Sequence, residues 1–234
     1  MRGAILQCDE VMEQLQPRFG RYGEMIRRLF AGSGETIGFD EFDCRQGEYP
    51  AEPGDYDFFV TTGSQASAYD PEPWILRLIE FVRHLDAGGH VLLGICFGHQ
   101  IIAMAGHGRV ERSARGWGIG VARNRILATP EWLDPVPAEL EMLVSHQDQV
   151  VATSGDPLVI AGSDFCPLFM VQWNHHFLSV QGHPEWDAGY ARALIGERRH
   201  LLPTERVEAA LRSLQQPPDN TLFAHWALRF IRSR

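Results

Sequence analysis

The first half of the chain alternates short apolar runs with amphipathic segments, and this alternation limits the fold more than any other feature. Strands are expected at 3–8, 36–44, 57–62 and 90–95, and helices at 22–30, 73–86 and 97–105. The run at 90–95 is almost entirely apolar, which is typical of a strand buried on both faces. Strands that alternate with helices form an open parallel sheet covered on both faces. The sequence therefore predicts an α/β fold with a mostly parallel central sheet.

The second half of the chain has a different pattern, in which short strands follow one another with turns between them. These strands are expected at 118–127, 141–151, 157–161, 169–173 and 177–181, as antiparallel additions to the same sheet. Helices are expected within 187–214 and at 222–231. The last helix places Leu222, Trp226 and Phe230 on one face, which indicates either a core contact or a homodimer contact. Residues 1–234 are expected to form a single domain, because this length suits one core.

The composition argues against several classes of protein. With 21 Lys and Arg against 30 Asp and Glu, the net charge of −9 disfavours general binding to nucleic acid. No apolar run is long enough for a membrane helix, and Asp9 stands where a signal peptide has its apolar centre, so a cytoplasmic location is expected. No two of the four cysteines have C-x-x-C spacing. We therefore expect free thiols, no metal site and no cofactor.

The segment 94–100, Gly-Ile-Cys-Phe-Gly-His-Gln, lies between a buried strand and a helix. This G-x-C-x-G pattern is the cysteine version of the strained turn that presents a nucleophile in hydrolases. The helix that follows points its N-terminus at the Cys96 sulfur and favours its thiolate. The backbone N–H of Phe97 is placed to meet an oxyanion. The alternative is a buried cysteine between two packing glycines, so Cys96 is a candidate nucleophile.

A cysteine nucleophile needs a base and a group that orients the base. The segment Gly-His-Pro-Glu at 182–185 follows an apolar strand in the same sense that Cys96 follows its own strand. Pro184 restricts His183, and Glu185 is close enough to hold the imidazole in one tautomer. His175 and His176 are rival bases, but an exposed turn is expected at their position. The pattern favours His183 as the base and Glu185 as its partner.

Together the two motifs resemble those of the class I glutamine amidotransferases, and the similarity extends in the family's order from about residue 3 to residue 186. The resemblance implies a flavodoxin-like three-layer sandwich with added antiparallel strands. It also implies a catalytic triad of Cys96, His183 and Glu185, which acts through a γ-glutamyl thioester without a metal. Where the family has a Gly-Gly-Pro-like oxyanion strand, this chain has Thr-Gly-Ser-Gln at 62–65, so Gly63 and Phe97 are the expected oxyanion donors.

A third segment, Ser-His-Gln-Asp-Gln-Val at 145–150, resembles the S-H-x-D-x-V segment in the glutaminase domain of GMP synthases. The resemblance implies that Ser145, His146 and Gln147 help hold the amino-acid end of the substrate. It implies the same role for Gln100. Without the resemblance, this segment is more simply a strand end followed by a polar turn.

Three functions are compatible with these residues. The first is hydrolysis of glutamine to glutamate and ammonia, acting with a separate synthetase subunit, because the stretch after Glu185 is too short for a synthetase domain. The second is a self-sufficient γ-glutamyl peptidase, because residues 67–75 resemble a subgroup of stand-alone members that includes plant γ-glutamyl peptidases. The third is a binding or regulatory protein without catalysis, which the intact Cys96, His183 and Glu185 disfavour. The first function is the preferred expectation.

Overall fold

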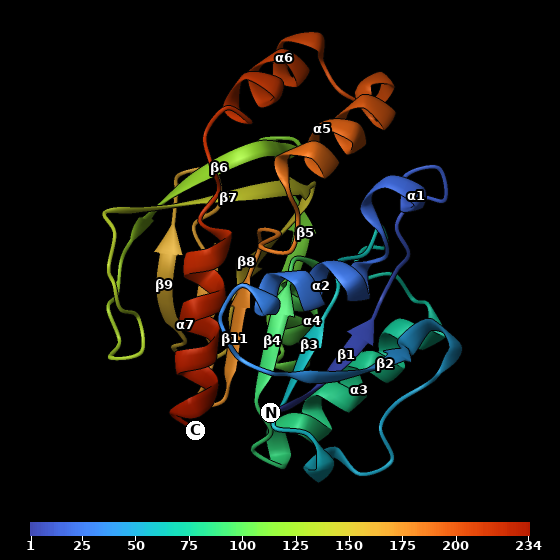
Figure 1. Ribbon diagram of the computed structural model, residues 1–234, viewed down its shortest axis with the longest axis vertical. Coiled ribbons are helices and arrows are strands. Elements are labelled where there is room, and N and C mark those ends of the chain that lie inside the picture. The colour runs from blue at the N-terminus through green and yellow to red at the C-terminus, as the bar shows by residue number, and fades with distance from the viewer.

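A nine-stranded sheet runs through the molecule in the order β2-β1-β3-β4-β11-β10-β9-β6-β7, and the computed structural model describes all of residues 1–234 (Figure 1). A separate pair, β5-β8, forms a second sheet. The strands of the large sheet are β1 (Arg2–Gln7), β2 (Gly38–Asp43), β3 (Phe58–Thr61), β4 (Leu92–Ile95), β6 (Gly118–Ile126), β7 (Glu139–His146), β9 (Leu158–Gly162), β10 (Met170–Gln172) and β11 (Phe177–Val180). The strands of the small sheet are β5 (Arg109–Arg112) and β8 (Asp148–Ala152).

The large sheet is parallel from β2 to β11 and antiparallel from β11 to β7. The predicted α/β fold with a mostly parallel sheet and added antiparallel strands is therefore confirmed. One expectation was wrong, because β11 is not an antiparallel addition but pairs in parallel with β4, with Val180 opposite Ile95. The crossover that brings β11 beside β4 depends on contacts distant in sequence, and local spacing carries no signal for it.

Helices cover both faces of the sheet, which gives the predicted three layers. The structure has α1 (Gln16–Phe19), α2 (Tyr22–Ala31), α3 (Pro73–Ala87), α4 (Phe97–Ala105), α5 (Ala188–Glu197), α6 (Thr204–Ser213) and α7 (Asn220–Arg232), with 3₁₀ turns at Cys44–Gln46, Pro53–Asp55 and Arg199–Leu201. Side chains of α2 and α7 pack on one face, and side chains of α3 and α4 pack on the other. Helices α5 and α6 lie beyond one end of the sheet (Figure 1). No helix is both long and apolar enough to span a bilayer.

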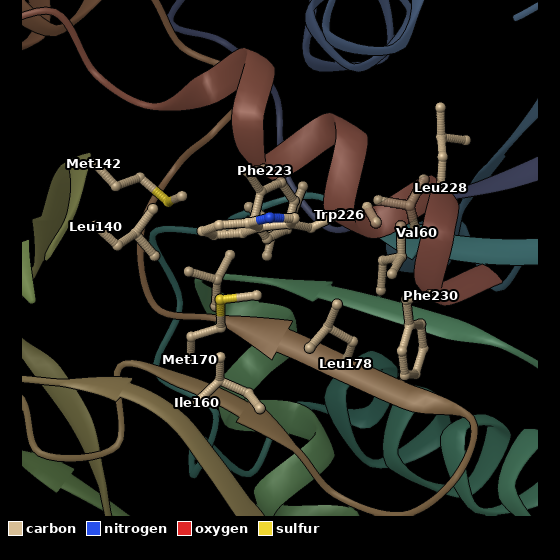
Figure 2. Packing of buried hydrophobic residues seen from close by; sticks show 14 of the residues in the cluster. Val60, Leu140, Met142, Ile160, Met170, Leu178, Phe223, Trp226, Leu228 and Phe230 are labelled. Carbon is tan, nitrogen blue, oxygen red and sulfur yellow. The ribbon is translucent and has the colours of Figure 1, made fainter. Parts of the chain in front are cut away.

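The apolar stripe of α7 belongs to the core. Trp226 and Phe230 are fully buried, and Leu222 packs against the same cluster. Figure 2 shows Trp226 beside Phe223, over the strands that carry Met170 and Leu178. Of the two expectations for this stripe, the core contact is confirmed by the burial of Trp226 and Phe230.

The expectation of one strand over 141–151 was wrong, since β7 ends at His146 and β8 begins at Asp148 in the other sheet. The chain changes sheets at Gln147, whose carbonyl accepts a hydrogen bond from the Ser113 amide at 2.8 Å. Strand β5, which pairs with β8, was not predicted. Both strands are short and pair across a long separation in the chain, so the apolar pattern of either one does not reveal the break.

Candidate active site

Cys96 occupies a strained turn between β4 and α4. Its φ of 50° and ψ of −96° are unusual for a residue with a side chain. The flanking glycines are required by space: a Cβ at Gly98 would lie 1.6 Å from Thr61 Oγ1, and one at Gly94 would lie 3.0 Å from the Gly98 carbonyl carbon. Helix α4 therefore sits directly against β3 and β4. The predicted strand–turn–helix geometry is present, and it places the Cys96 sulfur at the carboxyl end of β4.

A cavity of about 220 Å³ opens at the carboxyl ends of the parallel strands β3, β4 and β11. Cys96 is only 5% exposed, and it lines the cavity. The cavity is also lined by Gly63, Gln100, Ser145, His146, Gln147, Asp148, His183, Trp186, Glu197 and Arg198. All the residues predicted for the site except Phe97 and Glu185 therefore face one space. The Cys96–His183 pair meets because β4 and β11 are parallel neighbours that end side by side.

His183 is held on two sides. Its Nδ1 donates to Glu185 Oε1 at 2.7 Å, which leaves Nε2 for the substrate or the sulfur. The Trp186 indole stacks on the imidazole, with ring centroids 3.5 Å apart and planes 8° from parallel. Both His183 and Glu185 are buried. The imidazole is therefore fixed in one tautomer and one orientation.

Electrostatics favour a charged imidazole at this position. Burial acts to lower the pKa of His183, but the negative charges of Cys96 and Glu185 outweigh it and raise that pKa from 6.5 to about 9. A protonated His183 beside the Cys96 sulfur is able to donate a proton to a leaving group after attack by the sulfur.

The raised pKa of His183 predicts a pH-dependent stability. Because the folded-state value of about 9 exceeds the unfolded value of 6.5, this contribution is complete below pH 6.5 and is lost as the pH rises to about 9. The difference in unfolding free energy between wild type and H183Q should shrink by roughly 3 kcal/mol over this range. Urea denaturation at several pH values measures it. In a C96A background the change should be smaller, and a difference that grows with pH would contradict the assignment.

The rival histidines do not reach the sulfur. His176 donates through Nε2 to Asp86 Oδ1 at 2.9 Å, and it precedes β11, whereas His183 follows this strand. His146 faces the cavity, but burial lowers its pKa to about 4, and its Nδ1 donates to the Asp148 carbonyl at 3.1 Å. Burial lowers the pKa of His99 to about 3. Both are neutral at pH 7, and neither meets Glu185.

Of the two predicted oxyanion donors, Gly63 lines the same cavity as Cys96, and Phe97 follows Cys96 directly in the chain. The Gly63 amide follows β3, lines the cavity and donates no hydrogen bond within the chain. Phe97 is the first residue of α4, where the backbone N–H has no partner in its own helix. The carbonyl of Gly63, which belongs to the next peptide group, accepts from Thr62 Oγ1 at 3.0 Å. Their role as oxyanion donors stays a prediction.

The residues predicted to bind substrate line the cavity, and some have additional partners. Ser145 Oγ accepts from Arg198 Nη1 at 2.7 Å, and Gln100 Nε2 donates to the Asp148 carbonyl at 3.0 Å. The Asp148 carboxylate accepts from the hydroxyls of Ser67 at 2.6 Å and Tyr69 at 3.3 Å. Ser67 and Tyr69 thus hold the side chain of Asp148, a residue that lines the cavity. The roles of the predicted residues in substrate binding remain predictions.

Several residues of the site were missed by the sequence analysis. Arg198 follows α5, and its guanidinium lies over the Trp117 ring, 5.5 Å from the centroid. It has no carboxylate partner, although it lines the cavity. Gln181 ends the run before Gly182 and donates through Nε2 to the Cys96 sulfur at 3.5 Å. For Gln181 and Trp186 the adjacent motif was a usable signal, but nothing in the local sequence pointed to Arg198.

No group of three His, Cys, Asp or Glu side chains is arranged to hold a metal ion. The four cysteines are all free thiols, as predicted. The chemical groups gathered at the site are the Cys96 thiol, the His183 imidazole, the Glu185 carboxylate and the amides around them.

Comparison with known proteins agrees with this arrangement. Residues 62–197 match the family model described as "Glutamine amidotransferase class-I". Gamma-glutamyl peptidase 3 of Arabidopsis thaliana is 33% identical, with 97% of this chain and 94% of that protein covered. Gamma-glutamyl peptidase 2 of the same plant is 29% identical, with 100% and 96% covered. The crystal structure of a glutamine amidotransferase from Thermotoga maritima superposes with a TM-score of 0.75 at 19% identity, over 99% of this chain and 96% of that one.

The chain belongs to the class I glutamine amidotransferase family, because the family model covers more than half of it. The resemblance stated from its motifs is thus confirmed, and so is the flavodoxin-like fold. It is an enzyme of the hydrolase type, with the cysteine nucleophile typical of this family.

Proposed function

We propose that this member of the class I glutamine amidotransferase family hydrolyses γ-glutamyl amide bonds through a thioester on Cys96, with γ-glutamyl peptides as its preferred substrates. The observation that carries the proposal is the convergence of Cys96 and the Glu185-bound His183 in one cavity. A nucleophile, a base and an orienting carboxylate are the complete set that acyl transfer to sulfur requires.

The steps follow from the positions of these groups. The Cys96 thiolate attacks the γ-carbonyl carbon, and the amides of Gly63 and Phe97 donate to the oxyanion that forms. Protonated His183 gives its Nε2 proton to the departing amine nitrogen, and the carbon–nitrogen bond breaks. Neutral His183 then takes a proton from water, which attacks the thioester and releases glutamate. Glu185 keeps the imidazole in the tautomer that both proton transfers need.

The cavity also suits the amino-acid end of a γ-glutamyl group, which carries one ammonium and one carboxylate. The guanidinium of Arg198 is a cation without a carboxylate partner, and it matches the α-carboxylate. The carboxylates of Asp148 and Glu197 line the same space and can accept from the ammonium. A simple amide without these charges would leave Arg198 unpaired.

Two candidate leaving groups remain, and the relatives favour the larger. Met12, Tyr22 and Leu201 also line the cavity, and they offer apolar surface to a peptide. The plant relatives that cover nearly the whole chain are named as peptidases. Hydrolysis of glutamine, with ammonia passed to a separate synthetase subunit, is the second candidate, and the family description supports it.

The proposal is tested by comparing two substrates with the purified protein. Release of glutamate and of the amine is followed from a γ-glutamyl dipeptide or glutathione, and release of glutamate and ammonia from glutamine. We expect kcat/KM for the peptide to exceed that for glutamine by at least about tenfold. The reverse order would favour the second candidate. Absence of both activities, with the thiol intact and reactive, would contradict γ-glutamyl hydrolysis.

A further inference from the structure

A buried chain of side-chain amides leads from the main chain of β8 to the sulfur of Cys96. Gln100 Nε2 donates to the Asp148 carbonyl at 3.0 Å and to Gln181 Oε1 at 3.2 Å. Gln181 Nε2 in turn donates to Cys96 Sγ at 3.5 Å, a normal length for a bond to sulfur. Gln100 and Gln181 are both buried. These contacts join three elements, since Gln100 lies on α4, Asp148 on β8, and Gln181 directly after β11.

The direction of the Gln181 amide is set by its neighbours. A main-chain carbonyl only accepts, so the atom of Gln100 that faces Asp148 must be its NH₂ group. The second hydrogen of that group points to Gln181, so the atom of Gln181 that faces it must be the oxygen. The remaining NH₂ of Gln181 then faces the sulfur. A flipped Gln181 would put two donors together and an oxygen against the thiolate.

The position of this donor fits a charged sulfur. Cys96 is almost fully buried, and a thiolate there has lost most of its hydration. His183 supplies a positive charge, and the Gln181 amide supplies a hydrogen bond from another direction. The main chain of Gln181 is also anchored, because its N–H donates to the Phe169 carbonyl at 2.8 Å. The donor is therefore held in place before substrate arrives.

We propose that Gln181 is a further catalytic residue, whose side-chain amide stabilises the Cys96 thiolate by a hydrogen bond, and that Gln100 is a positioning residue for that amide. This rests on the proposed function only in taking Cys96 as the nucleophile. Gln100 thus has a second task besides the substrate binding expected from the motif. Loss of the donor lowers the thiolate fraction, and so it lowers reactivity most at low pH.

The test measures the sulfur directly, without turnover. Rates of Cys96 alkylation by iodoacetamide are followed by peptide mass spectrometry from about pH 5 to about pH 9. We expect Q181L to react about tenfold more slowly at low pH, because a hydrogen bond to a charged group is lost. Q181E, of the same size, should react more slowly still, since it places a carboxylate beside the sulfur. In both variants the rate profile should move to higher pH, and Q100L should show a smaller displacement in the same direction.

The matched control is Q172L on the neighbouring strand β10. Gln172 also uses both ends of its amide, accepting from Trp132 Nε1 at 3.0 Å and donating to the Asn174 carbonyl at 2.9 Å, but it does not touch Cys96. Its alkylation profile should match the wild type. Profiles of Q181L and Q181E that match the wild type at every pH would overturn the proposal. A displaced profile supports it even if no γ-glutamyl substrate is cleaved.

A measurement on the wild type covers the case in which the variants do not fold. One of the two side-chain amide proton resonances of Gln181 should shift in the NMR spectrum when Cys96 is alkylated. Those of Gln172 should not move. An unchanged Gln181 resonance would count against the hydrogen bond.

Discussion

The C96A variant is expected to lose γ-glutamyl hydrolysis by about 10⁴-fold or more, because removing the nucleophile leaves the base and the oxyanion donors without a covalent route. Since Cys96 is small and its turn is set by the neighbouring glycines, the fold should persist. The loss is therefore expected in kcat, and a cooperative unfolding transition should remain. Initial rates with a γ-glutamyl peptide, together with a thermal melt, measure both quantities.

Intact-mass spectrometry adds a direct readout of the thioester. Acid-quenched wild type with substrate should carry the mass of one γ-glutamyl group, and C96A should not. The matched control is C44A, because Cys44 is also buried but packs in the cluster between the sheet and α3. C44A should keep turnover and lose about 1 kcal/mol of stability. Full turnover by C96A would show that the nucleophile is another group.

The G63A variant should reduce kcat by about 100-fold or more, because it displaces the base. A Cβ at Gly63 would lie 2.7 Å from His183 Cε1, closer than carbon atoms can approach. The imidazole cannot retreat, since Trp186 stacks on its ring and Glu185 holds Nδ1 at 2.7 Å. His183 must therefore move relative to the Cys96 sulfur.

This substitution separates two roles of the glycine, since alanine keeps the backbone N–H. If Gly63 served only as an oxyanion donor, G63A would retain its activity. The control is G38A in β2, where a new Cβ meets no atom within 4 Å. G38A should leave kcat unchanged. Comparable rates for G63A and G38A would mean that His183 does not act as the base from the position seen in the structure.

The local features of the site could be predicted because each is contained in a few consecutive residues. The glycines around Cys96 leave room for β3 and α4, and the five-residue pattern G-x-C-x-G at 94–98 contains both of them. His183 and Glu185 are two residues apart, so their contact needs no long-range information. The helix expected at 97–105 begins and ends at Phe97 and Ala105 in the structure.

What the sequence specified is thus the strand and helix order, the strained cysteine turn and the paired histidine and glutamate, since periodicity and short motifs arise from local backbone preferences. Which strands pair with one another was determined by the tertiary structure. The parallel pairing of β11 with β4 brings His183 and Gln181 to Cys96, and the change of sheet at Gln147 turns Asp148 toward Gln100. Arg198 reaches the cavity only because α5 packs beyond the sheet end. Such contacts join residues far apart in the chain, and they follow from burial of the whole core and not from any local spacing.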